Sequence, residues 1–192
     1  MDLLLQRALD FEKITHYKYK YTMGRKGKLY IFEVDFRYSD FHHLIGLQKL
    51  TDLDYLQTKR KIVFKRILSG EITHDNLKNS VHYREMCDRF DAFDKFAKLF
   101  NDKNTTYKYT QDLRYSQIPA DYLFTNDTYG TLLYIFVTKR DNEDLYCCES
   151  FFPFDQFKYE YGQTKLTMLK VERYNIDTNE TEIIFRNENY TE

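Results

Sequence analysis

The spacing of apolar residues changes from a helical to a strand-like period near residue 105. Before that point apolar side chains recur every three or four residues over 2–13, 41–50 and 83–100, which predicts amphipathic helices. After it, apolar and β-branched runs such as Leu132–Val137 alternate with turn sequences. Helices first and strands last indicate an α+β fold with an antiparallel sheet rather than alternating βαβ units.

A hairpin is predicted inside the helical half. Tyrosines at every second position of Tyr17–Tyr21 have strand periodicity, Gly24–Gly27 supplies a turn, and Lys28–Phe36 is β-prone. The remaining predicted elements are a basic helix over Lys59–Ser69 and strands over Leu145–Phe152, Lys165–Glu172 and Glu182–Arg186. We therefore expect N-terminal helices and a hairpin packed on a C-terminal antiparallel β-sheet.

The chain of 192 residues has no internal repeat and no linker rich in Gly, Ser or Pro, with 6 Gly and 2 Pro in all. This predicts a single domain over 1–192, with a helical portion including the hairpin over 1–104 and a sheet portion over 105–192. Hydrophobic residues make up 42% and charged residues 31%, which is typical of a folded globular protein.

Three cysteines cannot form a disulfide framework, so a reducing compartment is expected. No apolar run approaches the roughly 20 residues that cross a bilayer, and the N-terminus lacks the pattern of a signal peptide. These features predict a cytoplasmic protein without a membrane partner. Neither a metal nor a cofactor is expected, because CxxC, HExxH, GxGxxG and P-loop motifs are missing.

The net charge of −1 conceals an uneven distribution, since residues 1–100 carry 19 Lys and Arg against 14 Asp and Glu. Residues 101–192 carry 10 against 16, so an anionic partner on one side, or a protein partner, is one interpretation. A chance distribution over a solvated surface is another. The strongest basic cluster, Lys59–Lys61 with Lys65 and Arg66, has the same two interpretations: phosphate contacts or a solvated helix face.

The predicted helix over 41–50 places two polar residues on its apolar side. At roughly 100° per residue, His43 and Gln48 fall within the apolar arc, whereas His42 and Lys49 lie on the opposite side. The apolar arc consists of Phe41, Leu44, Ile45, Leu47 and Leu50. Polar groups aimed inward must be hydrogen-bonded or open onto a cleft. A satisfied core histidine remains the alternative to a catalytic His43.

Two motifs carry a family resemblance. The first is FxHLxGLxKL over Phe41–Leu50; the second is SFFP from Ser150, followed by YxYGQ over Tyr159–Gln163. Asn79-Ser80 and Asp88-Arg89 in the middle helices agree with the same pattern. Together the motifs resemble the phage-associated nuclease-like domains of the Barnase–EndoU–colicin–RelE (BECR) fold, more narrowly their fourth phage-associated group. The resemblance covers roughly residues 5–175.

The resemblance implies a helical portion packed on an antiparallel sheet, and a metal-independent ribonuclease of phage or mobile-element origin acting as a toxin or effector. Such enzymes attack the phosphate with the ribose 2′-hydroxyl, which requires a base, an acid and donors to the phosphate oxygens. The residues that match are then candidates. The catalytic candidates are His43, Ser150, Tyr161 and Gln163, and Lys49 and Arg89 are candidate phosphate partners. The basic cluster, independently of the resemblance, adds Lys61, Lys65 and Arg66 as RNA- or phosphate-binding candidates.

Each candidate also has a structural interpretation. Tyr161 can be a core aromatic residue, Ser150 a strand-end cap, and Gln163 a neighbour in the sheet. A second functional hypothesis is a non-catalytic module on the same scaffold that inhibits a host or rival protein, as an anti-defence or host-takeover factor does, through its basic helices or an exposed sheet edge. A cognate antitoxin is the protein partner that the toxin hypothesis allows. The sequence leaves the oligomeric state open.

Overall fold

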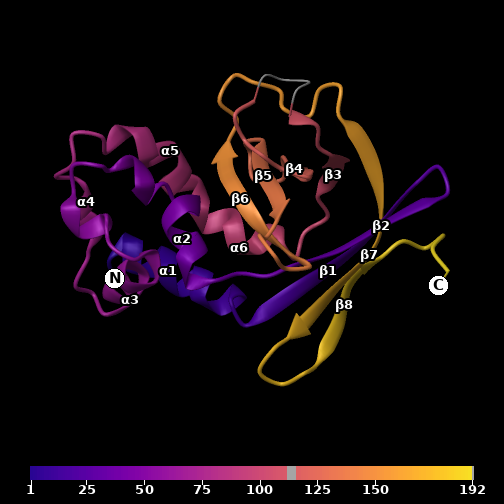
Figure 1. Cartoon of the computed structure of the whole chain (residues 1–192), viewed down its shortest axis with the longest axis horizontal. Helices are drawn as coiled ribbons and strands as arrows, with labels where there is room; N and C mark the ends of the chain where they lie inside the picture. Colours follow the sequence, from indigo (N-terminus) through magenta and orange to yellow (C-terminus); the bar gives the residue numbers. More distant parts are fainter. Residues whose placement is uncertain (112–115, 192) are drawn as a thin grey trace.

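The computed structural model describes residues 1–111 and 116–191 (Figure 1). Its α-helices are α1 (Leu3–Ile14), α2 (Tyr38–Leu44), α3 (Arg60–Leu68), α4 (His74–Leu77), α5 (Arg84–Ala92) and α6 (Phe96–Leu99). Three short 3-10 helices are η1 (Leu47–Lys49), η2 (Asp54–Leu56) and η3 (Phe93–Lys95). The strands are β1 (Tyr17–Arg25), β2 (Lys28–Val34), β3 (Thr105–Lys108), β4 (Tyr122–Asn126), β5 (Leu133–Lys139), β6 (Leu145–Pro153), β7 (Thr164–Asn175) and β8 (Thr181–Arg186). The chain is therefore mixed α+β, with most helices before most strands.

The helices form where the apolar period predicts them, but two of them end early. Asp2 caps α1 by accepting a hydrogen bond from the Leu5 amide at 3.0 Å. The expected helix over 83–100 is divided into α5, η3 and α6. The 3-10 turn stacks the rings of Phe93 and Phe96 at 5.0 Å and directs both against Phe151 of the sheet. Packing against the sheet thus overrides the continuous period.

The strands form a closed sheet, which differs from the simple antiparallel sheet expected. The order is β1-β2-β6-β5-β4-β3-β7, and β7 pairs back with β1 to complete a seven-stranded barrel, while β8 adds to β7. The hairpin β1–β2 is therefore part of the sheet rather than packed on it. The short β2–β6 pairing is parallel, and the other pairings in the described residues are antiparallel. Periodicity identifies strands but not their partners, which explains the difference.

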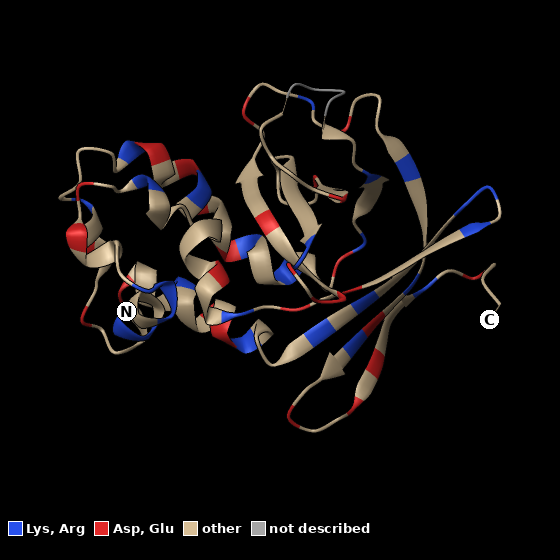
Figure 2. Cartoon of the chain, viewed as in Figure 1, with Lys and Arg blue, Asp and Glu red and all other residues tan. Residues whose placement is uncertain are grey.

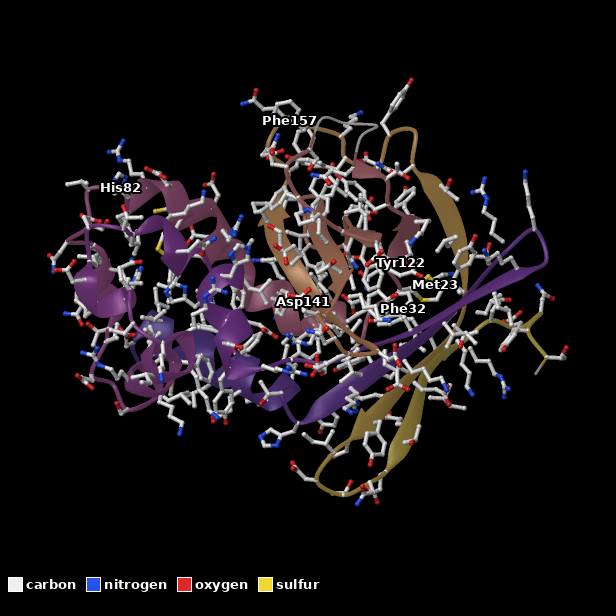
Figure 3. All side chains as sticks on the ribbon, in the orientation of Figure 1. Met23, Phe32, His82, Tyr122, Asp141 and Phe157 are labelled. Carbon is white, nitrogen blue, oxygen red and sulfur yellow. The ribbon has the colours of Figure 1, made fainter. Side chains whose placement is uncertain are left out.

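Aromatic side chains fill the inside of the closed sheet. Phe32 of β2 and Tyr122 of β4 stack across it with ring centroids 4.1 Å apart, and Figure 3 shows both beside Met23. Phe36 and Phe100 extend the same core to the helices at one end of the sheet. A second, smaller cluster lies on the other face of β4 and β5 and contains Tyr109, Leu123, Tyr134 and Phe136.

The closed sheet also changes how the charges are distributed. Lys18 and Lys20 of β1 share a surface hollow with Glu172 of β7, because β1 pairs with β7. Figure 2 shows basic and acidic residues interspersed on helices and strands. Basic residues from the first half of the sequence and an acidic residue from the second half therefore lie on the same surface. None of the helices built by the described residues has the length and apolarity that crossing a bilayer requires.

A buried ion-pair network connects the turn after β5 to the start of α2. Arg140 donates to Asp35 and Asp40, each at 2.5 Å, and all three side chains are about 11–12% exposed. Arg37 adds a bond to Asp35 at 3.1 Å. This network fixes the segment between β2 and α2, and α2 in turn packs on β6. The end of α2 therefore has a defined position against the sheet.

Candidate active site

A cleft of about 400 Å³ opens where α2, η1 and α5 meet β6. Its walls include His43, Gln48, Lys49, Arg89, Glu149 and Ser150. Four of these six, His43, Lys49, Arg89 and Ser150, are candidates that the sequence singled out. The cleft therefore joins residues more than 100 positions apart in the chain.

A break at Gly46 shapes this cleft and corrects the helix expected over 41–50. Helix α2 ends at Leu44, Gly46 follows with φ 97° and ψ 10°, and the short helix η1 then runs in a new direction. Glycine adopts this left-handed conformation without the steric cost of a Cβ atom. The break turns Lys49 into the cleft with His43, whereas a straight helix would have placed it on the other side.

Of the two adjacent histidines, His42 departs from what helical geometry predicts and His43 does not. His42, expected to face outward, is 5% exposed, and its Nε2 is 3.0 Å from the Leu56 carbonyl. His43 is half-buried and lines the cleft together with Gln48, whose Oε1 is buried without a hydrogen-bond partner. His43 thus opens onto a cleft as expected, whereas Gln48 reaches the cleft wall with its carbonyl oxygen buried and unpaired.

His43 has an environment that favours its neutral form. Burial lowers the pKa of the imidazole below its ordinary value, and the positive charges of Arg89 and Arg60 lower it further. A hydrogen bond with the backbone carbonyl of Glu149 acts in the opposite direction. The ring is therefore uncharged at neutral pH and can accept a proton.

A β-bulge in β6 directs Glu149 into the cleft. Phe136 pairs with Ser150, and the next residue, Val137, pairs with Cys148, so Glu149 is an extra residue in β6. A regular strand would send Glu149 and Ser150 to opposite faces, but both line the cleft. Burial raises the pKa of the Glu149 carboxyl, and the charge of Arg60 opposes that shift.

Glu149 is the functional candidate that sequence reasoning missed. It lies directly before the Ser-Phe-Phe-Pro motif, but strand alternation places it on the face opposite Ser150. The pairing with β5 shows the broken alternation, because the register shifts by one residue between Cys148 and Ser150. No residue in the motif itself signals the bulge. Arg60, whose charge acts on both His43 and Glu149, was also missed as an individual candidate.

Arg89 is a cation at the wall of the cleft that forms no ion pair with a described carboxylate. It donates to the His43 carbonyl at 3.1 Å and lies over the ring of Phe152, 5.7 Å from its centroid. Burial lowers the pKa of the guanidinium to about 10, so it stays charged at neutral pH. An arginine has five N–H donors, and the bond to His43 uses one of them. The others can bind an anion.

The remaining charges at the cleft are mixed. Lys49 donates to the Glu85 carbonyl at 2.7 Å, and burial lowers the pKa of its ammonium group. Carboxylates at the wall are Glu85, Asp88, Glu149 and Asp155. The cleft as a whole is therefore not basic, so an anion would be bound by specific contacts rather than by a broad positive field.

Two of the expected catalytic residues lie outside the cleft. The side-chain amide of Gln163 accepts from the Thr110 amide at 2.8 Å and donates to the Thr110 carbonyl at 3.0 Å, which connects the start of β7 to the end of β3. Tyr161 is 69% exposed and lines a neighbouring hollow. These two residues therefore do not line the cleft with His43 and Ser150, and their assignment as catalytic residues stays a prediction. They come after the bulged strand and its loop.

The basic residues of α3 also lie outside the cleft walls. Lys61 and Lys65 are exposed, and Arg66 forms an ion pair with Glu71 at 2.7 Å. Their assignment as phosphate contacts stays a prediction. In the part of the chain that the structure describes, no cluster of three or more His, Cys, Asp or Glu side chains has the arrangement of a metal site.

The comparison with known proteins identifies a family. Residues 3–188 match the family described as phage-Barnase-EndoU-ColicinE5/D-RelE like nuclease 4. Neither a curated protein nor a solved structure matches the chain. The match spans nearly the whole chain, which includes the cleft, and the family is one of nucleases, so nucleic acid is its expected substrate. The chain belongs to the phage-associated BECR-like nuclease family, as its two sequence motifs indicate.

Proposed function

We propose that the chain is a metal-independent endoribonuclease that cleaves RNA by attack of a ribose 2′-hydroxyl, with its active site in the cleft of α2, α5 and β6. The observation that carries this proposal is the presence of His43, Glu149 and the guanidinium of Arg89 in one cleft. The reaction needs a proton acceptor, a proton donor and a cation for the phosphate. The three side chains supply these functions without a metal.

The proposed reaction assigns one proton transfer to each acid–base group. Neutral His43 takes the proton of the 2′-hydroxyl as its oxygen bonds to phosphorus. The bond between phosphorus and the 5′-oxygen breaks, and Glu149 donates a proton to that oxygen. The products are a 2′,3′-cyclic phosphate and a 5′-hydroxyl. The lowered pKa of His43 and the raised pKa of Glu149 favour this assignment over the reverse one.

Arg89 and Ser150 would bind the phosphate during this reaction. The guanidinium is held by the His43 carbonyl, so it is positioned relative to the proposed base before substrate binds. Donors fixed in advance stabilise developing charge without the cost of reorganisation. The Ser150 hydroxyl, 6% exposed at the bulge, can donate to a second phosphate oxygen.

Incubation of the full chain with single-stranded RNA in the presence of a chelator tests the proposal. Fragments that end in a 2′,3′-cyclic phosphate are expected, and a strand with 2′-deoxyribose at the cleavage position should stay intact. His43→Ala should reduce the rate by about 10²–10⁴-fold, the usual contribution of a general base. His16→Ala is a matched control, since His16 lies outside the cleft and contacts Asp177 at 2.6 Å. RNA that stays intact at high protein concentration contradicts the proposal.

A substrate with a sulfur atom in place of the bridging 5′-oxygen tests the role of Glu149. This leaving group needs no protonation, so Glu149→Gln should regain most of its rate on that substrate, whereas His43→Ala should not. If only His43→Ala regained its rate on this substrate, His43 would be the proton donor and Glu149 the base. The profile of rate against pH cannot make this distinction, because both assignments use the same singly protonated pair.

The biological role proposed is that of a toxin or effector of a phage or another mobile element. Family membership supports the phage association, and RNA cleavage would be harmful inside a host. Expression of the wild-type chain should therefore slow cell growth, and His43→Ala should relieve this effect. Equal growth with both chains would argue against a toxic ribonuclease.

A non-catalytic protein-binding module is the second candidate. The observation in its favour is the tip of the hairpin, where Lys28–Phe32 of β2 pair with β1 alone among the described strands. Leu29 and Ile31 on this free edge are 51% and 55% exposed. Such an edge can add a strand from a partner. Capture of a partner that survives His43→Ala, without RNA cleavage, would favour this candidate.

A further inference from the structure

A second hollow, of about 680 Å³, adjoins the proposed active site. Gln117, Ile118 and Tyr159 line both the hollow and the cleft, so the two meet along a shared wall. Among the residues that the structure describes, the other lining residues are Ser116 and members of the loop between β6 and β7. The cleft and the hollow are therefore adjacent, so a polymer bound in the cleft can reach the hollow.

Large aromatic side chains are exposed at this hollow. Phe157 is 66% exposed and Tyr161 69% exposed, and Figure 3 shows Phe157 on the outer loop beyond β6. Lys158 lies between them in the chain and also lines the hollow. The described lining residues include this one lysine and no carboxylate, in contrast to the mixed charge of the cleft. The hollow thus combines aromatic faces with a positive charge.

Hydrogen bonds to β5 and within the loop itself hold the loop that carries these rings. The hydroxyl of Tyr134, a residue with 0% exposure, lies 3.1 Å from the Phe157 carbonyl oxygen and 2.8 Å from a Glu160 carboxylate oxygen, which share its single proton. Asp155 accepts from the Phe157 amide at 3.2 Å and from the Tyr159 hydroxyl at 3.1 Å. The backbone of Phe157 is therefore fixed from both sides while its ring stays in solvent. Because the backbone is already ordered, less entropy is lost when a ligand stacks on the ring.

We infer that this hollow binds the unpaired bases beside the phosphate that is cleaved, so that the protein selects single-stranded RNA; this inference rests on the proposed ribonuclease function. Bases stack on Phe157 and Tyr161, and Lys158 contacts the backbone. Stacking on aromatic side chains tolerates any base, because every base has a flat face. Bases in a duplex have both faces covered by their neighbours, so a duplex cannot occupy the hollow.

The lack of tryptophan in the chain allows a direct test. Phe157→Trp introduces a single fluorophore on the proposed platform, and Ile31→Trp introduces one at an exposed position of β2 as the matched control. The ligand is a 2′-O-methyl oligonucleotide of about ten residues, which 2′-hydroxyl attack cannot cleave. We expect this strand to quench emission at position 157 and to leave position 31 unchanged. The same strand annealed to its complement should bind at least about ten-fold more weakly.

Removal of the ring measures its contribution to affinity. Phe157→Ala should raise the Kd for a labelled strand about five- to 150-fold, which corresponds to a stacking contribution of about 1–3 kcal/mol. Ile31→Ala should leave the Kd unchanged. The preference for the single strand should also decrease in Phe157→Ala.

The outcomes separate this inference from the proposed function. RNA cleavage with an unchanged strand preference in Phe157→Ala overturns the inference and leaves the ribonuclease in place. If the oligonucleotide quenches emission at position 157 but the wild-type chain cleaves no RNA, the ribonuclease proposal is overturned and the binding site is retained. Emission at position 157 that responds to a protein partner and to neither form of the oligonucleotide assigns the hollow to a protein interface instead.

Discussion

The substitution Gly46→Ala tests whether the break after α2 holds the cleft together. Gly46 has φ 97°, and an added Cβ would lie 3.2 Å from the Met86 Cβ and 3.4 Å from the Arg89 Cδ. The left-handed conformation costs an alanine about 1–2 kcal/mol. Crowding against α5 adds about 1–3 kcal/mol, the usual cost of overpacking. We therefore expect a total loss of about 2–5 kcal/mol in the free energy of unfolding.

Gly70→Ala is the matched control, because Gly70 follows α3 as Gly46 follows α2. Its φ is 76°, but nothing lies within 4 Å of an added Cβ, so this variant should show the conformational cost alone. With about 2 kcal/mol of crowding, the Tm of Gly46→Ala should fall about 4–8 °C below that of Gly70→Ala, as measured by thermal unfolding. Equal Tm values for the two variants would show that an added Cβ at position 46 is not crowded by α5, which would refute the reasoning.

Three further predictions concern salt, pH and the buried ion pairs. If the two cations of the cleft alone bind phosphate, affinity for an uncleavable single strand should fall about seven-fold between 50 and 200 mM salt. Added contacts from Lys61, Lys65 and Arg66 of α3 would make the loss about 100-fold. Burial lowers the pKa of His42 in the folded chain, so the unfolded chain takes up a proton at higher pH and the free energy of unfolding decreases as the pH falls below about 6.5. Urea unfolding at pH 7.5 and 5.5 should show a smaller decrease for His42→Gln than for the wild-type chain. An equal decrease in both chains would contradict this. Arg140→Met leaves Asp35 and Asp40 without their shared cation and should cost about 3–5 kcal/mol in urea unfolding, against about 0–1 kcal/mol for Lys139→Met, whose partner is exposed.

The sequence predicted the class of the fold better than its connections. The helix over 2–13, the hairpin and the strands after residue 105 follow from periodicity and turn residues, and the structure confirms them. The closed sheet depends on pairings such as Tyr17 with Asn175, which join distant parts of the chain. Local patterns hold no information on these pairings, because the same alternation suits several partners.

The candidate site was predictable where helical spacing and motifs were informative. His43 follows from its place in an apolar arc, and Arg89 and Ser150 follow from the resemblance. Glu149 did not, because a bulge moves its side chain from one face of the strand to the other. Lys49 was placed on the wrong side because Gly46 was treated as an ordinary helical residue. In both cases one backbone irregularity changed the direction of a side chain.

The bulge in β6 has a consequence for how relatives of this chain should be compared. The direction of the Glu149 carboxyl depends on the number of residues between Cys148 and Ser150 as well as on the acidic residue itself. Loss of a single codon there would restore regular pairing and remove the proposed proton donor, while His43 and the Ser-Phe-Phe-Pro motif stayed intact. Gaps in this strand, more than substitutions, are thus the changes that would separate active family members from inactive ones.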